Sequence, residues 1–553
     1  MSLTSSTWVA LLGICVGCGS AKPPDSGGPS AGGSAGAVAS GGASNMVAGA
    51  SGVNGQSAGG SPSAGSPGAG LGGLGDSSGG ASSAGAPGNG AGSAGAAGSA
   101  GGGTPAATVV KVSYGTARQK IDGFGMATSW GSIPPDAQLD AFFSVSKGAG
   151  LSILRNRIPF REAPANNDNF MGGGNYEFTS APTGAIHKTF KLNWSNWDLS
   201  AMRALIGKLK ANPDYQVPTY FSTPWTPPNN DTSRWKLGVA DYVNAPEVGG
   251  YLDPAHYVDY ADVLADYVLG FASNMGAPLA ALSLQNEPNF KVTYESADWS
   301  AAQFHAFLAT LKTEFTFKGV FTTLPNFTIL APEDPNFKED LILPSLADSN
   351  TAALVGIVGA HQYEFGPWNV ATYAPAPLTA SLAANKRVWV TEWNTSAFTN
   401  TTPLATALLL AGLISADLTK ASVSAYVHWW FKDLVSSAGA PNKNLWALGQ
   451  FSRFVRPGAS RVEAPSGVGN DLLLAAFKNA AGTELTLVAV NRGSATTTFA
   501  LELDSGTLGA VSSYRTSASE DLKSLGSAPS GGYFANLTAP AQSISTFVVP
   551  VLH

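Results

Sequence analysis

The chain has 553 residues, a formal net charge of −6 and a pI near 5.6, and only 12% of its residues are charged. Its Lys and Arg are scattered, which excludes a nucleic-acid partner, because proteins that bind nucleic acid neutralise phosphates with clustered cations. Of the 65 glycines, 30 lie in residues 19–107, which lack the strict Gly-X-Y period of collagen. The composition predicts a low-complexity arm joined to an ordinary globular part.

The N-terminal segment resembles an export signal. Residues 8–17 are apolar, which suits a signal peptide and is too short for a bilayer span. Both cysteines, Cys15 and Cys18, lie in this region, so a disulfide framework and a Cys-ligated metal are excluded from the globular part. Small Gly17 before Cys18 is typical of a bacterial lipoprotein cleavage site, with Cys18 as the lipidated residue. The alternative is an ordinary secretory signal whose cysteines are removed.

We therefore expect residues 1–18 to be a signal peptide and the protein to be exported, either secreted or anchored by lipid at the bacterial cell surface or outer membrane. Residues 19–107, built from Gly, Ala and Ser, bury too little apolar surface to offset their ordering entropy. We expect this arm to be a disordered linker with a root-mean-square reach of roughly 50 Å.

Residues 121–456 alternate short apolar runs with amphipathic, helix-like stretches. The helix-like stretches include 199–211, 256–274, 300–315 and 403–417. The apolar runs are Ile121–Met126, Ser152–Ile158, Val217–Ser222, Ala281–Gln285, Thr328–Ala331, Val355–Ala360, Val388–Thr391 and Ser424–Trp430. Eight buried strands separated by helices predict a (β/α)₈ TIM barrel, an α/β fold. The alternative is a doubly wound sheet, but Gly123-Phe124-Gly125-Met126 lacks the third glycine of its phosphate-binding turn.

Residues 457–553 have a different pattern. Short β-rich runs are separated by Gly, Ser and Asn, and no helical period is present; the runs are Leu472–Phe477, Glu484–Asn491, Thr497–Leu503, Ala510–Thr516 and Ser543–Val549. This pattern predicts a side β-sandwich domain. The segment 108–120, which precedes the barrel, is predicted to contribute a strand to that sandwich.

Reactive side chains follow three of the eight predicted strands. Glu287 follows the fourth, His361 and Tyr363 follow the sixth, and Glu392 follows the seventh. Active sites of such barrels lie at the carboxyl ends of the strands. Two carboxylates across the barrel mouth suit glycoside hydrolysis, which inverts or retains the anomeric configuration according to their separation. The sequence does not fix that separation.

A set of motifs in this order resembles glycoside hydrolase family 30 over essentially all of residues 108–553. The motifs are Gln119-Lys120-Ile121-Asp122-Gly123-Phe124-Gly125, Leu154-Arg155-Asn156-Arg157-Ile158, Thr223-Pro224-Trp225-Thr226-Pro227-Pro228, Gln285-Asn286-Glu287-Pro288, Thr391-Glu392 and Gly449-Gln450-Phe451-Ser452-Arg453-Phe454-Val455-Arg456-Pro457-Gly458. The resemblance implies a barrel with a side β-sandwich and a retaining mechanism, with Glu287 as acid/base and Glu392 as nucleophile. The xylanase branch is most similar, because Tyr294-Glu295-Ser296-Ala297-Asp298-Trp299 follows the acid/base in a similar way.

Several other residues are candidates to support the reaction. Asn286 is placed to donate a hydrogen bond to the sugar 2-OH, a contact that strengthens in the transition state. Arg155 or Arg157 could hydrogen-bond the nucleophile and keep it ionised, and their i, i+2 spacing leaves both open. In the resembling family, His361 and Tyr363 lie near the nucleophile. No metal and no organic cofactor is implied.

Aromatic side chains are expected to line the sugar subsites, because flat rings stack on the apolar faces of pyranoses. Besides Tyr294, the candidates are Trp130, Trp225, Trp299, Trp393 and Trp430. Trp429 and Trp430 should alternate in direction along a strand, so one of the two is expected in the barrel core.

Our prediction is an exported, monomeric endo-β-1,4-xylanase acting on a xylan-like β-glycan. Glucuronoxylan-specific members of the branch carry an Arg after the eighth strand, whereas this chain has Lys432 with Asp433 beside it, an arrangement expected to repel a uronate. We therefore expect no strict need for glucuronic acid branches. The alternative within the class is a β-1,6-glucanase or another family 30 glycosidase. Outside the class, it is a non-catalytic carbohydrate-binding surface protein.

Overall fold

The computed structural model describes residues 106, 108–160, 176–180, 186–229, 234–364, 375–395, 401–465, 468 and 471–553. The predicted signal peptide, with Cys18, and the predicted arm apart from Ala106 lie outside these residues.

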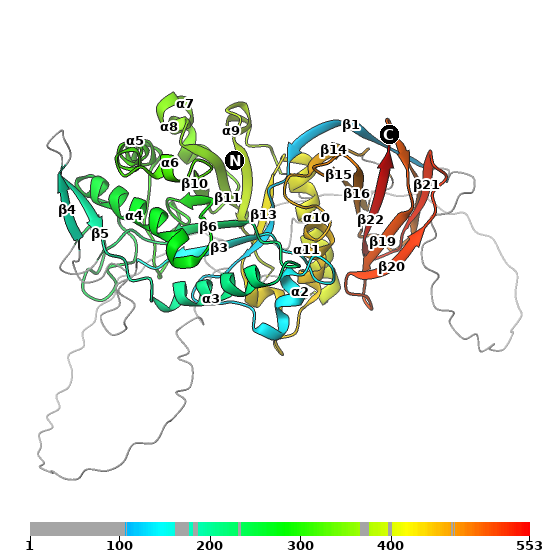
Figure 1. The fold of residues 1–553 in the computed structure, drawn as a ribbon, viewed down its shortest axis with the longest axis horizontal. Coiled ribbons are helices and arrows are strands. Elements are labelled where there is room, and N and C mark those ends of the chain that lie inside the picture. Colours follow the sequence, from blue (N-terminus) through cyan, green and yellow to red (C-terminus); the bar gives the residue numbers. More distant parts are fainter. Residues whose placement is uncertain are drawn as a thin grey trace, which may run out of the picture. The chain divides into compact units, whose positions relative to one another are not determined.

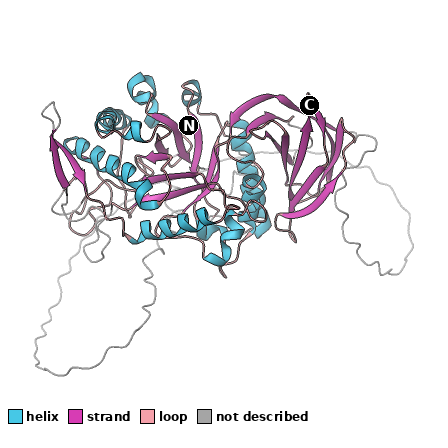
Figure 2. Ribbon diagram, viewed as in Figure 1, coloured by secondary structure: helices cyan, strands magenta, loops and turns pink. Residues whose placement is uncertain are grey.

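Eight parallel strands close into a barrel, as predicted (Figures 1 and 2). Around the barrel the order is β10-β11-β12-β13-β2-β3-β6-β9. In chain order the strands are β2 (Gly123–Ala127), β3 (Ile153–Ile158), β6 (Thr219–Pro224), β9 (Ala281–Ser283), β10 (Thr328–Asp334), β11 (Val355–His361), β12 (Arg387–Glu392) and β13 (Ala425–His428). Each of the eight apolar runs overlaps one of these strands, and the doubly wound alternative is excluded.

Both faces of the barrel strands are buried, so apolar residues occupy much of their length. Every residue of β2 and β3 is buried. The barrel interior is filled by one cluster of side chains, Ile153, Phe221, Ala281, Leu330, Ile357, Trp389, Ala425 and Val427. At Gly125 the backbones approach so closely that a Cβ atom would lie 2.1 Å from the carbonyl oxygen of Ile153. The Gly-Phe-Gly motif thus has a packing role between β2 and β3.

Helices surround the barrel (Figure 2). The longer ones are α3 (Trp197–Ala211), α4 (Tyr257–Met275), α5 (Ala301–Phe317), α10 (Pro403–Lys420) and α11 (Lys443–Ser452). Shorter ones are α2 (Leu139–Phe143), α6 (Val320–Thr323), α7 (Leu343–Ala347), α8 (Ser349–Ala352), α9 (Thr379–Ala383) and the 3₁₀ turns η2 (Asp136–Gln138), η3 (Pro254–His256), η4 (Asp340–Ile342) and η6 (Phe431–Leu434). Among the described helices, α10 alone is long and apolar enough to cross a membrane, but most of it is buried inside the protein, as in a core helix.

Two small hairpins extend from the barrel. The first is antiparallel and consists of β4 (Tyr176–Ser180) and β5 (Ile186–Phe190), which follow β3. The second consists of β7 (Lys236–Leu237) and β8 (Tyr251–Leu252), which follow β6.

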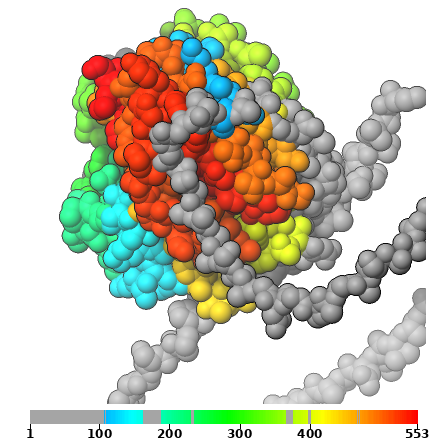
Figure 3. Space-filling model, turned by 90° about the vertical axis from the view of Figure 1, so that its right-hand side faces the viewer, coloured from blue at the N-terminus to red at the C-terminus, as the bar shows by residue number. Residues whose placement is uncertain are grey.

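The second sheet structure is assembled from both ends of the described chain. Its strands are β1 (Val109–Lys120), β14 (Ser460–Glu463), β15 (Leu472–Lys478), β16 (Glu484–Asn491), β17 (Thr497–Leu503), β18 (Thr507–Leu508), β19 (Val511–Thr516), β20 (Lys523–Ala528), β21 (Phe534–Ala539) and β22 (Ser543–Leu552). The first part of β1 pairs parallel with β17 and the rest pairs antiparallel with β14. In Figure 3 the blue atoms of this segment accordingly lie beside orange and red ones.

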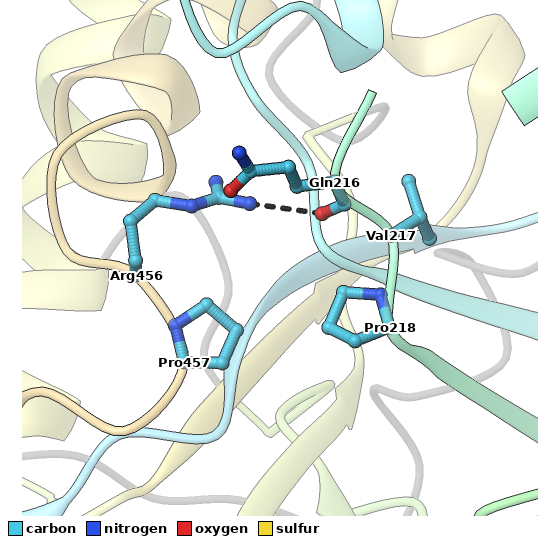
Figure 4. Close-up of a pocket in the computed structure, with 5 residues that line it drawn as sticks. All are labelled: Gln216, Val217, Pro218, Arg456 and Pro457. Atoms are coloured by element: carbon cyan, nitrogen blue, oxygen red, sulfur yellow. Dashed lines mark hydrogen bonds between the residues drawn. The ribbon is translucent and has the colours of Figure 1, made fainter. Parts of the chain in front are cut away.

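The motif Gly449–Gly458 connects barrel and sheet domain at the end of the barrel opposite the carboxyl ends of the strands. The backbone carbonyl and side-chain oxygen of Gln450 accept hydrogen bonds from Thr546 Oγ1 at 2.8 and 2.6 Å. Arg456 donates to the carbonyl of Gln216 at 2.9 Å, beside a pocket of about 400 Å³ (Figure 4). This pocket lies next to the start of β6, so it is not where the predicted catalytic residues are.

Candidate active site

The two predicted catalytic carboxylates lie at the carboxyl ends of barrel strands. Glu392 is the last residue of β12, and Glu287 follows β9 after a short turn. Both side chains are only 6% exposed. Glu287 has a left-handed backbone (φ 46°), as have Trp130 (φ 53°) and Glu333 (φ 59°). Non-glycine residues adopt this conformation at an energetic cost, and such residues cluster at functional sites.

The carboxylates of Glu287 and Glu392 lie close to one another. One oxygen of each and a ring nitrogen of His361 are all within 4.8 Å of one another. His361 Nδ1 lies 3.1 Å from Glu287 Oε1, and its Nε2 lies 3.9 Å from Glu392 Oε2. Tyr363 donates its hydroxyl to Glu392 Oε1 at 2.7 Å. The structure therefore brings together both predicted carboxylates and both residues predicted after the sixth strand.

The surroundings of Glu287 raise its pKa. Burial raises the pKa of Glu287, the hydrogen bond from His361 opposes this rise, and the charge of Glu392 adds to it. Burial lowers the pKa of His361, but the charge of Glu392 and contacts with Glu287 and Glu333 outweigh burial and raise it to about 9. The ring is thus an imidazolium at neutral pH.

Arg155, not Arg157, reaches the predicted nucleophile. Its Nη1 donates to Glu392 Oε2, and its Nη2 donates to Asn286 Oδ1 at 2.7 Å. Arg155 is fully buried, and its guanidinium lies 4.8 Å from the ring centre of Trp225. Because Arg155 occupies the amide oxygen of Asn286, the amide NH₂ is the part of Asn286 that can donate to a sugar hydroxyl.

Arg157 stabilises the loop that follows β2. It donates to Glu295 at 3.1 and 2.5 Å and to Asp198 at 3.1 Å. Asp198 in turn accepts the backbone N–H groups of Trp130 at 3.2 Å and Gly131 at 2.8 Å. Arg157 is therefore placed to position Trp130 rather than a carboxylate that reacts.

Glu333 is a third buried carboxylate of the site, and the sequence analysis missed it. Its Oε1 lies 3.2 Å from Arg155 Nη2 and 3.7 Å from His361 Nε2, and Ser283 donates to its Oε2. Burial would raise the pKa of Glu333, but Arg155 and His361 outweigh burial and lower it to about 2. With Glu287 protonated, the anions Glu333 and Glu392 balance the cations Arg155 and His361. The sequence does carry a signal for Glu333, because this charged residue, in Pro332-Glu333-Asp334, comes directly after an apolar run.

Four tryptophans form one cluster beside Arg155. The ring of Trp130 lies 5.3 Å from that of Trp225, 5.8 Å from Trp429 and 6.3 Å from Trp430. The expectation that Trp429 and Trp430 alternate is wrong, since their rings stack at 5.4 Å with planes 7° apart. Strand β13 ends at His428, so regular alternation does not extend to this pair. Trp225 is buried in the cluster, whereas the other three are partly exposed and can face a sugar.

The remaining predicted aromatic residues differ in their exposure. Trp299 is 3% exposed, packs on Phe304 and Phe307, and donates to Gln285, which places it in the core behind the site. Trp393 is also buried. Tyr294 is partly exposed and lies near enough to Tyr363 to contribute to the raised pKa of that phenol, which has burial as its main cause.

The side chains of Lys432 and Asp433 have different contacts. The Lys432 ammonium lies 4.8 Å from the ring centre of Trp430, and Lys432 is exposed. Asp433 Oδ2 instead pairs with His428 Nε2 at 2.6 Å and accepts from Thr395 Oγ1 at 2.7 Å. Asp433 is therefore engaged with the barrel, and the expectation that it would repel a uronate beside Lys432 loses its support.

Comparison with known proteins finds similar xylanases, although no family model matches the chain. Glucuronoxylanase XynC of Bacillus subtilis (strain 168) is 28% identical over 336 residues, which cover 60% of this chain and 73% of that protein. The crystal structure of Xyn30A, a subfamily 8 xylanase of glycoside hydrolase family 30 from Clostridium acetobutylicum, superposes with a TM-score of 0.64 at 27% identity, covering 80% of this chain and 100% of that chain.

A more distant structure, an endo-β1,6-glucanase, covers 80% of this chain and 94% of its own at 16% identity and a TM-score of 0.57, a likeness that shows the fold alone. The strand-end carboxylates and the likeness to xylanases in sequence and structure together exclude a purely non-catalytic binding protein. The chain is therefore a glycoside hydrolase acting on O-glycosyl bonds, and it is similar to the xylanases of glycoside hydrolase family 30.

Proposed function

We propose that the chain is a retaining endo-β-1,4-xylanase with Glu287 as acid/base and Glu392 as nucleophile. The observation that carries this proposal is the placement of oxygens of both carboxylates within 4.8 Å of one another. Retaining glycosidases have carboxyl groups about 5–5.5 Å apart, whereas inverting ones leave about 6.5–9.5 Å for a water molecule. The proximity supports double displacement.

In the first step, the Glu392 carboxylate attacks the anomeric carbon while Glu287 gives its proton to the departing glycosidic oxygen. The C–O bond to the leaving sugar breaks, and an ester between Glu392 and the sugar forms. In the second step, Glu287 takes a proton from water, the water oxygen attacks the anomeric carbon, and Glu392 leaves as a carboxylate. Arg155 and Tyr363, both hydrogen-bonded to Glu392, hold its two oxygens in place.

The two carboxylates are suited to these roles by their surroundings. Burial raises the pKa of Glu287, which keeps the proton that the leaving group needs. Glu392 lies against the Arg155 guanidinium, which compensates its negative charge. Asn286 is oriented by Arg155 so that its amide NH₂ can donate to the sugar 2-OH.

We further propose that glucuronic acid branches are not strictly required. Lys432 supplies a single exposed charge without the two-pronged geometry with which Arg binds a carboxylate. An ammonium of this kind can add affinity for a uronate in a substituted chain, but it leaves binding of unsubstituted xylose units to the tryptophan cluster.

A substrate panel tests the proposed specificity. Release of reducing sugar is measured on unsubstituted xylan, methylglucuronoxylan and β-1,6-glucan, with Glu392→Gln as the inactive control. We expect kcat/KM on the two xylans to agree within about tenfold, a difference of about 1.4 kcal/mol in transition-state binding. Activity restricted to methylglucuronoxylan would reject independence from the branch. Activity restricted to β-1,6-glucan would assign the alternative specificity within the family.

We also propose that the enzyme is exported and held at the cell surface by lipid on Cys18, with residues 19–107 as a tether, and that it acts as a monomer. The apolar run 8–17 and the Gly17-Cys18 junction support export and lipidation. Fractionation of cells that express the parent chain and Cys18→Ala tests the anchor. The parent is expected in the membrane fraction and the variant in the soluble exported fraction; equal solubility of both would reject the anchor. Light scattering of the purified enzyme is expected to give the mass of one chain.

A further inference from the structure

A buried cluster of one imidazole and two carboxylates lies outside the active site. His187 belongs to β5, Asp262 to α4 and Glu314 to α5. All three side chains are buried, and one possible ligand atom from each lies within 4.8 Å of the others. Figure 1 shows β4 and β5 beside α4, so the cluster is at the place where the first hairpin rests on the barrel helices.

One atom of this cluster lacks a hydrogen bond among the described residues. Asp262 Oδ2 accepts the backbone N–H of Lys188 at 2.6 Å, whereas Asp262 Oδ1, though fully buried, receives no hydrogen bond. The nearest cation is Lys318, whose Nζ lies 3.5 Å from Oδ1. Lys318 donates instead to the carbonyl of Lys188 at 2.6 Å and to Asp266 Oδ1 at 2.8 Å. A buried carboxylate oxygen without a donor favours a further cation.

More carboxylates than ammonium groups lie around the cluster. Four carboxylates gather where β5 meets α4 and α5, and they belong to Asp259, Asp262, Asp266 and Glu314. Two ammonium groups face them: Lys188 pairs with Asp259 at 2.6 Å, and Lys318 pairs with Asp266. Around the cluster the carboxylates thus outnumber the ammonium groups that pair with them, and a divalent cation could offset this excess. Buried charges in proteins are paired or coordinate a metal.

The donor set indicates which cation fits. One imidazole nitrogen with two carboxylate oxygens suits zinc and similar transition metals, whereas calcium takes six to eight oxygen ligands and magnesium retains several waters. Ligand atoms around tetrahedral zinc are roughly 3.4 Å apart, given bonds of about 2.1 Å. His187 Nδ1 and Glu314 Oε2 now touch in a hydrogen bond, so they would move slightly apart and His187 would lose its Nδ1 proton on binding.

We propose that His187, Asp262 and Glu314 form a structural zinc-type site that fastens the β4–β5 hairpin to helices α4 and α5. The three ligands come from three elements, so the metal crosslinks the hairpin to the helix layer. The hairpin follows β3, the strand that carries Arg155 and Arg157. The metal would therefore hold a segment of the chain close to the carboxyl ends of the barrel strands, where the active site lies. This site lies apart from the active site, and the sequence alone implied no metal in the protein.

Calorimetric titration of the full chain with zinc chloride, after removal of metals by a chelator, tests the site. We expect one zinc ion to bind and the melting temperature to rise by about 3–5 °C at a hundredfold excess over Kd. Asp262→Asn and Glu314→Gln, two variants that conserve shape, should each weaken binding by about a hundredfold. Calcium and magnesium should bind far more weakly than zinc.

Two controls make the result specific. Glu392→Gln removes a carboxylate of the other His-carboxylate cluster, in the active site, and should leave one zinc bound. His305→Gln alters a partly exposed histidine on α5 that pairs with Asp348 at 3.8 Å and should also leave binding unchanged. Zinc binding that survives both Asp262→Asn and Glu314→Gln, or that disappears in Glu392→Gln, would overturn the proposal, as would the absence of zinc binding. None of these measurements depends on the substrate that the enzyme cleaves.

Discussion

Replacing Glu333 by Gln removes a buried carboxylate that touches neither the predicted nucleophile nor the predicted acid/base. Glu333 is fully buried, and it compensates Arg155 at 3.2 Å and His361 at 3.7 Å. The substitution keeps the shape of the side chain but leaves two buried cations with Glu392 as their remaining anion when Glu287 is protonated. We expect the Glu333→Gln protein to fold with reduced stability.

The magnitude follows from the pKa of Glu333, which falls from 4.5 to about 2 because the effects of Arg155 and His361 outweigh burial. A change of this size corresponds to roughly 3 kcal/mol of stability at pH 7. Because the pKa of the folded state is the lower one, this stabilisation is complete well above pH 4.5 and is lost as the pH falls towards 2. The difference between parent and variant should shrink from roughly 3 kcal/mol at pH 7 to roughly 1 kcal/mol at pH 3.

Urea unfolding followed by tryptophan fluorescence at pH 7 and pH 3 measures both values. Glu463→Gln is the matched control, because Glu463 also contacts arginines, Arg118 and Arg461 at 3.2 Å each, but its own side chain is 44% exposed. Its loss should cost less than about 1 kcal/mol. A loss below about 1 kcal/mol for Glu333→Gln at pH 7, or a loss that stays constant down to pH 3, would refute the charge balance described for the site.

Three further predictions concern catalysis and the aromatic residues. Glu392→Gln should lower kcat by roughly 10⁴-fold or more with an unchanged circular dichroism spectrum, and residual activity within about tenfold of the parent would displace Glu392 as nucleophile. The pH profile of kcat/KM should fall on its basic side through the raised pKa of Glu287, because the leaving group needs its proton; a fall at the ordinary glutamate pKa of about 4.5 would contradict this. Trp130→Ala should raise KM by roughly tenfold with a small change in melting temperature, whereas Trp299→Ala, in the core, should destabilise the fold by about 3–5 kcal/mol.

The barrel strands could be predicted from sequence because strands buried on both faces give continuous apolar runs. The segment Val109–Lys120 could likewise be assigned to the sheet domain, since its β-rich pattern precedes the first barrel strand. Four strands of the sheet domain are absent from the sequence prediction, namely β14, β18, β20 and β21. Strands β14 and β18 are short, β20 has no buried residue, and β21 has only alternate ones, so none forms a long apolar run.

Glu333 was missed for a local reason. The fifth apolar run ends at Ala331, before a proline that usually interrupts a strand, yet β10 continues through Pro332 to Asp334. The sequence also could not show which of Arg155 and Arg157 reaches the nucleophile, because residues spaced i, i+2 share a face and their partners come from distant elements. Arg155 pairs with Glu392 and Glu333, whereas Arg157 pairs with Asp198 and Glu295.

The configuration of the first product tests the central claim most directly. Proton NMR of a xylo-oligosaccharide, recorded during the first minutes of hydrolysis before the anomers equilibrate, distinguishes retention from inversion. The proximity of Glu287 and Glu392 predicts that the new reducing end appears first as the β-anomer. Initial formation of the α-anomer would contradict double displacement and the roles assigned to both carboxylates.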